Sequence, residues 1–370
     1  MIKKTIILVL AIGIILGTLS PLMVVQAQGN ITILDSPAQA DFPLRLIFSL
    51  SARSDTAIND IRLHYQINRA DFAEVTSEVY VGFAPNTTVD ISWPLDMVKT
   101  GGLPPGSSLN YWWTIKDARG NSAQTSPSQV QFDDTRYAWL SMTEGKVTIY
   151  WYEGKESFAR EIMAAAQQAL ERLLKDTGAH LDDPIKIYIY ADARDLQGAM
   201  IFPQEWTGGV AFTRYGTIAI GIAPDNLEWG KSATAHELAH LVIHQMTSNP
   251  YGDLPTWLDE GLAMYAEGEL SPGFAAYLDR AISENNLISV RSLCSPFSAY
   301  ADKAILSYAQ SYSLVDFLIT DYGQYKMLQL LNAFKQGSGY DAALKKVYNF
   351  DIEGLDAQWR DHVVTASTVR

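Results

Sequence analysis

The chain has 370 residues, of which 48% are hydrophobic and 19% are charged, with a formal net charge of -13. This length favours two hydrophobic cores over one, and the composition excludes a wholly disordered chain, while the acidic balance without a later lysine or arginine cluster excludes a nucleic-acid-binding surface. Because Cys294 is the single cysteine, an intramolecular disulfide and a cysteine-ligated zinc site are also excluded.

The first segment, Met1 to Ala27, predicts a secretory signal. Lys3 and Lys4 precede an apolar run from Ile6 to about Val25, and Val25-Gln26-Ala27 has the small-x-small pattern of a cleavage site. The run is close to the roughly 20 residues that span a bilayer, so an uncleaved membrane anchor is the alternative. In both cases we expect the rest of the chain to lie outside the cytoplasm, secreted or anchored at the cell surface.

Residues 30 to 136 predict an all-β sandwich. Short runs of alternating hydrophobic residues are separated by turn-forming stretches such as Gly101-Gly102 and Pro104-Pro105-Gly106. This texture resembles an immunoglobulin or fibronectin type III-like module, which would either bind a partner or act as a passive spacer. The predicted strands are Leu44 to Leu50, Ile61 to Ile67, Val75 to Phe83, Thr88 to Trp93, Leu109 to Ile115 and Val130 to Phe132.

From residue 137 to 365 the pattern changes to that of an α+β domain. Ser157 to Lys175 has helical spacing, and almost everything after Glu228 is helical. Arg214-Tyr215-Gly216 separates two β-prone runs, which predicts a hairpin. The predicted strands of this domain are Val147 to Tyr152, Ile185 to Tyr190, Gly208 to Phe212 and Ile218 to Ile222.

The sequence His236-Glu237-Leu238-Ala239-His240 lies in a stretch without Gly or Pro that predicts a buried helix. Residues four apart lie on one face of a helix, so the two imidazoles can converge on one ion. Glu237 lies at the flank of this face, where its carboxylate can reach a water molecule without ligating the metal. Imidazole and carboxylate ligands favour zinc. The competing interpretation is a core helix whose histidines only satisfy hydrogen bonds.

A catalytic zinc site usually has three protein ligands, so a third is needed. Glu260 is the predicted ligand. Asp259 is the competing carboxylate, but it points about 100° away on the same helix, so only one of the two can face the metal. On a helix, the side chain of His244 points about 80° away from that of His236. We therefore expect His244 to support a ligand or to belong to the core.

The segment from His236 to Glu267 resembles the gluzincin metallopeptidases, which include the thermolysin and aminopeptidase N families. Trp257-Leu258-Asp259-Glu260-Gly261-Leu262-Ala263 is similar to the third-ligand helix of the aminopeptidase N group. The similarity to the bacterial peptidase MA-like domain covers most of Val147 to Val363. The resemblance implies Zn²⁺ on His236, His240 and Glu260, Glu237 as the general base, and Tyr308, or else Tyr312, as the donor to the oxyanion.

Two departures from these families matter. The Gly-x-Met-Glu-Asn sequence that reads a free amine in aminopeptidase N-like enzymes is absent, and Gly208-Gly209-Val210-Ala211-Phe212 occupies the equivalent stretch. Endopeptidase action is therefore the more natural expectation. The acidic residue four positions after the third ligand of thermolysin-type enzymes is replaced by Met264, and we expect Glu267 to partner a ligand histidine.

Together these patterns predict an extracytoplasmic zinc-dependent metallopeptidase that hydrolyses peptide bonds, with Glu237 as the general base for an activated water. We expect the peptide or protein substrate to lie extended along an edge strand that contains Gly209, Val210 and Ala211. Two alternatives stay open. One is a cell-surface binding or adhesion module that carries a catalytically inert metal domain, and the other is a reaction on a non-peptide amide.

Overall fold

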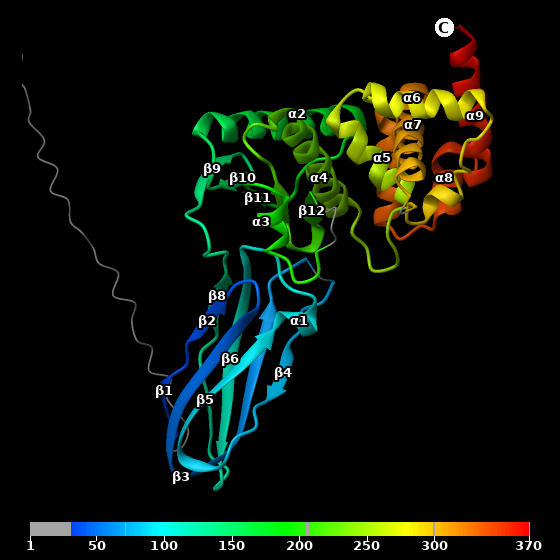
Figure 1. The fold of residues 1–370 in the computed structure, drawn as a ribbon. Coiled ribbons are helices and arrows are strands. Elements are labelled where there is room, and N and C mark those ends of the chain that lie inside the picture. Colours follow the sequence, from blue (N-terminus) through cyan, green and yellow to red (C-terminus); the bar gives the residue numbers. More distant parts are fainter. Residues whose placement is uncertain (1–30, 71, 204–207, 299, 370) are drawn as a thin grey trace, which may run out of the picture.

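The computed structural model describes residues 31–70, 72–203, 208–298 and 300–369. It contains a β-rich N-terminal region and a largely helical C-terminal part, with a five-stranded sheet between them (Figure 1). The predicted signal, Met1 to Ala27, lies outside the described residues. Within those residues, no helix combines the length and the apolar character needed to cross a membrane.

The β-rich region is organised around one long strand, β3 (Arg45–Ile67). Its first half pairs with β1, β2 and β5, its second half pairs with β4 and β6, and β6 pairs in turn with β7 and β8. Alternating hydrophobic side chains form one core in which Phe48 and Trp113 are fully buried. The other elements are β1 (Thr32–Asp35), β2 (Ala38–Asp41), β4 (Ser77–Tyr80), β5 (Asn86–Asp96), α1 (Met97–Thr100), β6 (Ser107–Asp117), β7 (Ser122–Gln124) and β8 (Ser128–Phe132).

Strand β3 corrects one prediction from the sequence. The runs Leu44 to Leu50 and Ile61 to Ile67 are predicted as separate strands, but β3 contains the second run and all of the first except Leu44. The chain stays extended between them, and the pairing register with β5 shifts between Arg53 and Ile58. The chain thus passes from one set of partners to the other through an irregularity instead of a turn.

The five-stranded sheet has the order β12-β13-β11-β10-β9. Strands β10, β11 and β13 are parallel, whereas β9 and β12 pair antiparallel at the two edges. Alternation along β11 places Ile185, Ile187 and Ile189 in the core with the helices, and Tyr188 and Tyr190 in the core of the β-rich region. The bounds are β9 (Leu140–Glu144), β10 (Val147–Trp151), β11 (Ile185–Tyr190), β12 (Gly209–Phe212) and β13 (Thr217–Gly221).

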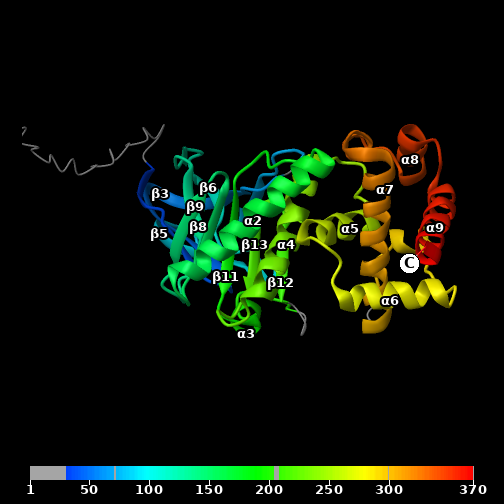
Figure 2. The same cartoon turned by 90° about the horizontal axis from the view of Figure 1, so that it is seen from above.

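Helices pack on one face of this sheet and continue into the C-terminal body (Figure 2). Helix α2 buries Phe158, Ile162 and Leu173, and it ends at Gly178, whose positive φ of 77° suits a glycine. Helix α7 is bent at Gly323. The helices are α2 (Glu156–Thr177), α3 (Ala193–Gln197), η1 (Thr213–Tyr215), α4 (Leu227–Thr247), α5 (Thr256–Glu267), α6 (Pro272–Ser283), η2 (Ser292–Cys294), α7 (Ala301–Lys335), α8 (Tyr340–Tyr348) and α9 (Ile352–Val369).

The β-rich region and the sheet share one hydrophobic core. Tyr188 and Tyr190 are buried in the same cluster as the side chains of β3 and β6. The Tyr190 hydroxyl donates to Asp134 Oδ2 at 2.9 Å, and Lys186 Nζ donates to the Gly106 carbonyl oxygen at 2.8 Å. These contacts hold the β-rich region against the sheet. Its immunoglobulin-like identity and the division at residues 136 and 137 stay predictions.

Candidate metal centre

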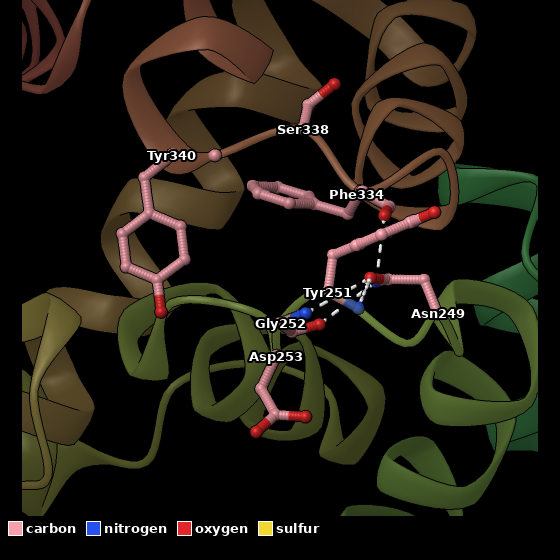
Figure 3. Close-up of a pocket in the computed structure, with 9 residues that line it drawn as sticks. Asn249, Tyr251, Gly252, Asp253, Phe334, Ser338 and Tyr340 are labelled. Carbon is pink, nitrogen blue, oxygen red and sulfur yellow. Dashed lines mark hydrogen bonds between the residues drawn. The ribbon is translucent and has the colours of Figure 1, made fainter. Parts of the chain in front are cut away.

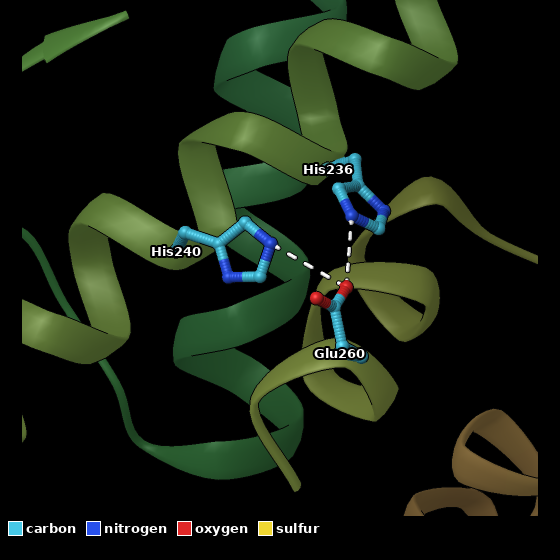
Figure 4. Close-up of side chains that lie close together, drawn as sticks. All are labelled: His236, His240 and Glu260. Carbon is cyan, nitrogen blue, oxygen red and sulfur yellow. Dashed lines mark ion pairs between the residues drawn. The ribbon is translucent and has the colours of Figure 1, made fainter. Parts of the chain in front are cut away.

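Two histidines on α4 form the first part of the centre. His236 and His240 lie one turn apart, with ring centroids separated by 5.0 Å. Their rings point from α4 toward α5 (Figure 4). Leu238 and Ala239, which lie between them in the sequence, are fully buried. The core contacts of α4 therefore fix the face on which both imidazoles lie.

Glu260 reaches the two histidines from α5. Its Oε2 lies 3.3 Å from His236 Nε2 and 3.6 Å from His240 Nε2 (Figure 4). One donor atom from each of the three residues lies within 4.8 Å of the others. The position of α5 depends on Gly261, because a Cβ there would collide with the carbonyl oxygen of Ser311 on α7.

The outer nitrogens of both rings have carboxylate partners. His236 Nδ1 lies 2.9 Å from Glu267 Oε1, and His240 Nδ1 lies 3.1 Å from Asp259 Oδ1. Each Nδ1–H donates to its carboxylate, which leaves the Nε2 lone pairs directed at Glu260. Glu260 Oε2 is buried and makes no hydrogen bond of ordinary geometry. With the proton of each ring on Nδ1, two imidazole nitrogens and one carboxylate oxygen converge, and this donor set fits a divalent cation.

The electrostatics of the site agree with this fit. Burial works against protonation of His236, but the neighbouring carboxylates of Glu260 and Glu267 outweigh it and raise its pKa to about 10. For His240, burial is likewise outweighed by the hydrogen bond to Asp259, and its pKa is also raised. A raised histidine pKa means that the surrounding carboxylates favour positive charge. A metal ion would supply that charge.

Glu237 lies between α4 and the edge strand β12. A Cβ on Gly209 would lie 3.2 Å from Glu237 Oε1, so glycine at this position allows the strand to lie close to the carboxylate without displacing it. Burial raises the pKa of Glu237, and a hydrogen bond from the Ala211 backbone lowers it by less. The carboxylate therefore stands beside the ligand histidines and next to the strand predicted to hold a substrate.

The predicted substrate residues Gly209, Val210 and Ala211 all lie on β12. This strand pairs with β13, and no other described strand pairs with it. Ala211 packs toward the helices, whereas Val210 packs toward the β-rich region. An edge strand with this geometry has main-chain groups that can pair with an extended peptide.

The structure distinguishes the two predicted tyrosines. The Tyr308 ring lies 6.4 Å from that of His236, and burial together with the charges of Glu260 and Glu237 raises its pKa to about 12. Tyr312 lies elsewhere, stacked on Tyr265 at 6.0 Å. Tyr308 is therefore beside the metal centre, and Tyr312 is not.

A protein-family model for the Peptidase MA superfamily matches residues 165–365, which is more than half of the chain. The chain belongs to the Peptidase MA superfamily. The matched range contains α4 and α5, the two helices that build the metal centre. No curated protein matches the chain.

Three solved structures show weaker similarity. An M1 zinc metallopeptidase mutant from Deinococcus radiodurans has 13% identity and a TM-score of 0.34, covering 90% of this chain and 95% of that chain. Aminopeptidase A from Legionella pneumophila with aspartic acid has 10% identity and a TM-score of 0.36, covering 90% and 50%. Wild-type OgpA from Akkermansia muciniphila has 13% identity and a TM-score of 0.22, covering 29% and 29%. The chain thus spans less than a third of OgpA, and similarity at this level does not bear on function.

In this Peptidase MA chain, Asp259 has a place that the sequence alone did not reveal. The sequence offers it only as a competing ligand, yet its carboxylate joins His240 Nδ1 to His244 Nε2, each at 3.1 Å. Burial raises the pKa of Asp259, but the hydrogen bonds with both histidines outweigh this and leave it below the usual value. The four-residue spacing of His240 and His244 was the available signal, because one carboxylate can bridge two rings on successive turns.

Proposed function

We propose that this chain is an extracytoplasmic zinc endopeptidase, with zinc held by His236, His240 and Glu260. The observation that supports it most directly is the convergence of two Nε2 lone pairs on a buried Glu260 oxygen without a hydrogen bond. When bound, zinc would supply the positive charge that acidifies water and polarises a carbonyl group. Membership of the Peptidase MA superfamily favours peptide bonds over other amides as the substrate.

Glu237, strand β12 and Tyr308 have separate roles in the proposed reaction. Glu237 accepts a proton from the attacking water and returns it to the amine that leaves. The free edge of β12 aligns the main chain of the substrate, since its glycine-containing sequence permits close approach. Tyr308 is the candidate donor to the oxyanion because its ring lies beside His236.

An endopeptidase is proposed instead of an aminopeptidase because the amine-reading sequence is absent from this chain. Residues 208–212, Gly-Gly-Val-Ala-Phe, contain no acidic side chain that could bind a terminal ammonium group. A peptide that is blocked at both ends should therefore be cleaved. Cleavage restricted to the first residue of unblocked peptides would contradict this part of the proposal.

The decisive experiment compares the purified zinc-loaded protein with the Glu237→Gln variant. The wild-type protein should contain one zinc ion and cleave a blocked peptide library. The variant should retain the zinc, and its kcat should fall by about 10²-fold or more, because the proton acceptor is lost. Equal turnover by the two proteins would exclude Glu237 as the base, and zinc-free wild-type protein with full activity would exclude the metal.

The proposed location and the form of the β-rich region have their own support. The apolar segment Met1 to Ala27 supports export, which N-terminal sequencing of the mature protein in a fractionated culture would test. The two halves of β3 pair with different strands around a shared core, which supports an immunoglobulin-like sandwich. An experimental structure of the β-rich region would test that fold.

A further inference from the structure

A cavity of about 510 Å³ lies beyond the C-terminal half of α4. We call it the α4 cavity. Its walls come from the β-rich region, from η1, from the end of α4 and from the loop between α4 and α5. The lining residues used below are Phe72, Asp183, Thr213, Arg214, His244 and Asp253.

The cavity lies along the same side of α4 as Glu237. His244 follows Glu237 by seven residues, so the two lie on nearly the same face of α4, about 10 Å apart along its axis. The wall of the cavity that faces α4 comes from η1. Strand β12 continues directly into η1, which carries Thr213 and Arg214. A peptide aligned along β12 would therefore pass from Glu237 into the α4 cavity.

The cavity walls are held by specific contacts. The Ala70 N–H donates to the Arg214 carbonyl oxygen at 2.7 Å, which ties the β-rich region to η1. Asn249 Nδ2 donates to the Phe334 and Gly252 carbonyl oxygens, each at 3.0 Å, and its Oδ1 accepts from the N–H groups of Tyr251 and Gly252 (Figure 3). These bonds fix the loop that carries Asp253. The cavity is therefore preformed.

We propose that the α4 cavity is a substrate subsite for a basic side chain three or four residues before the scissile bond. This inference rests on the proposed peptidase function. A peptide that pairs antiparallel with β12 has its N-terminal side toward η1, and at about 3.4 Å per residue its third or fourth residue reaches the cavity. The β-rich region contributes Phe72 to this subsite, so it is part of the substrate-binding surface and not a passive spacer.

The lining chemistry favours a lysine or arginine side chain. Asp183 and Asp253 are exposed, and their carboxylates form no ion pair with any described residue. Phe72 is 56% exposed, and its ring can cover the aliphatic part of a long side chain. Arg214 and His244 also line the cavity, but His244 is hydrogen-bonded to Asp259, and Arg214 interacts with a group other than the substrate. The net charge of -13 also favours cationic peptides.

The test uses full-length zinc-loaded protein and three fluorogenic peptides with the same scissile bond. One peptide has two residues before that bond, and two have five, with either lysine or glutamate at the third and fourth positions. We expect kcat/KM of the long lysine peptide to exceed both others by about tenfold, which is typical of one filled subsite. Equal values for the three peptides would overturn the subsite.

Variants locate the effect. In a protein with Phe72→Ala and Asp253→Asn, the ratio of kcat/KM for the long lysine peptide to that for the short peptide should fall to about one. The controls Tyr80→Ala and Asp182→Asn, an exposed aromatic residue on β4 and the neighbour of Asp183, should keep the wild-type ratio. An unchanged ratio in the double variant would also overturn the proposal. If no peptide is cleaved at all, the peptidase function itself fails instead.

Discussion

Two buried clusters of charged side chains differ in how completely their hydrogen bonds are satisfied. The first cluster lies between the β-rich region and the five-stranded sheet. Asp134 Oδ1 accepts hydrogen bonds from the backbone N–H and Nε of Arg136. Asp134 Oδ2 accepts hydrogen bonds from Arg136 Nη2 and the Tyr190 hydroxyl. In the metal centre, Glu260 Oε2 faces two imidazole nitrogens and has no hydrogen bond. A complete cluster stabilises a fold, whereas an incomplete one leaves room for a ligand.

The largest effect should come from removing the incomplete cluster's carboxylate. In Glu260→Ala, the third ligand is lost, and we expect zinc affinity to fall by more than about 100-fold with no detectable turnover. Competition with a chelator of known affinity measures the zinc affinity, and a peptide-cleavage assay measures the turnover. Retention of tight zinc binding would show that the convergence on Glu260 is not the metal site.

The matching change in the complete cluster should affect stability instead. Asp134→Ala leaves Arg136 and the Tyr190 hydroxyl without their partner, and the free energy of unfolding should fall by about 3 kcal/mol. Chemical denaturation measures this value. The folded variant should bind zinc as tightly as the wild type. A large loss of zinc affinity would break the comparison between the two clusters.

An intermediate effect is expected where a carboxylate orients a ligand. Asp259→Ala and Glu267→Ala remove the partners of His240 Nδ1 and His236 Nδ1, and each should weaken zinc binding by about 10- to 100-fold. His244 contacts the ligand His240 only through Asp259. Substitution of His244 should therefore weaken zinc binding less than either Asp259→Ala or Glu267→Ala. If His244→Ala weakens zinc binding more than Asp259→Ala, this order is wrong.

The smallest effect concerns acid stability of the β-rich region. Hydrogen bonds from Asn121, with a smaller contribution from Ser54, lower the pKa of Asp117 well below its usual value, against the effect of burial. Because the folded pKa is below the unfolded value of about 3.9, this stabilisation is present above pH 4 and is lost as pH falls further. Asp117→Asn should flatten the pH dependence of unfolding between about pH 4 and pH 2. An unchanged slope would mean that Asp117 does not contribute to it.

The sequence by itself determined which residues share a helix face and which segments form four of the five strands of the sheet, but it did not predict β9. His236, His240 and Glu237 lie on α4 as their spacing predicts, and the predicted strand Ile185 to Tyr190 matches β11. These features depend on short-range periodicity, which is set by backbone geometry. For the same reason, the pattern could not show that two hydrophobic runs form one strand, β3, because that depends on which partners pair with each half.

Only the tertiary structure decided how distant elements meet. Tyr308 and not Tyr312 lies beside the metal centre. Asp259 is hydrogen-bonded to both His240 and His244. Phe72 and the end of α4 line the same cavity. Each of these depends on packing between segments far apart in the chain, such as the close approach of α5 and α7 at Gly261. Local spacing sets the direction of a side chain along its own helix, but the fold decides what that side chain meets.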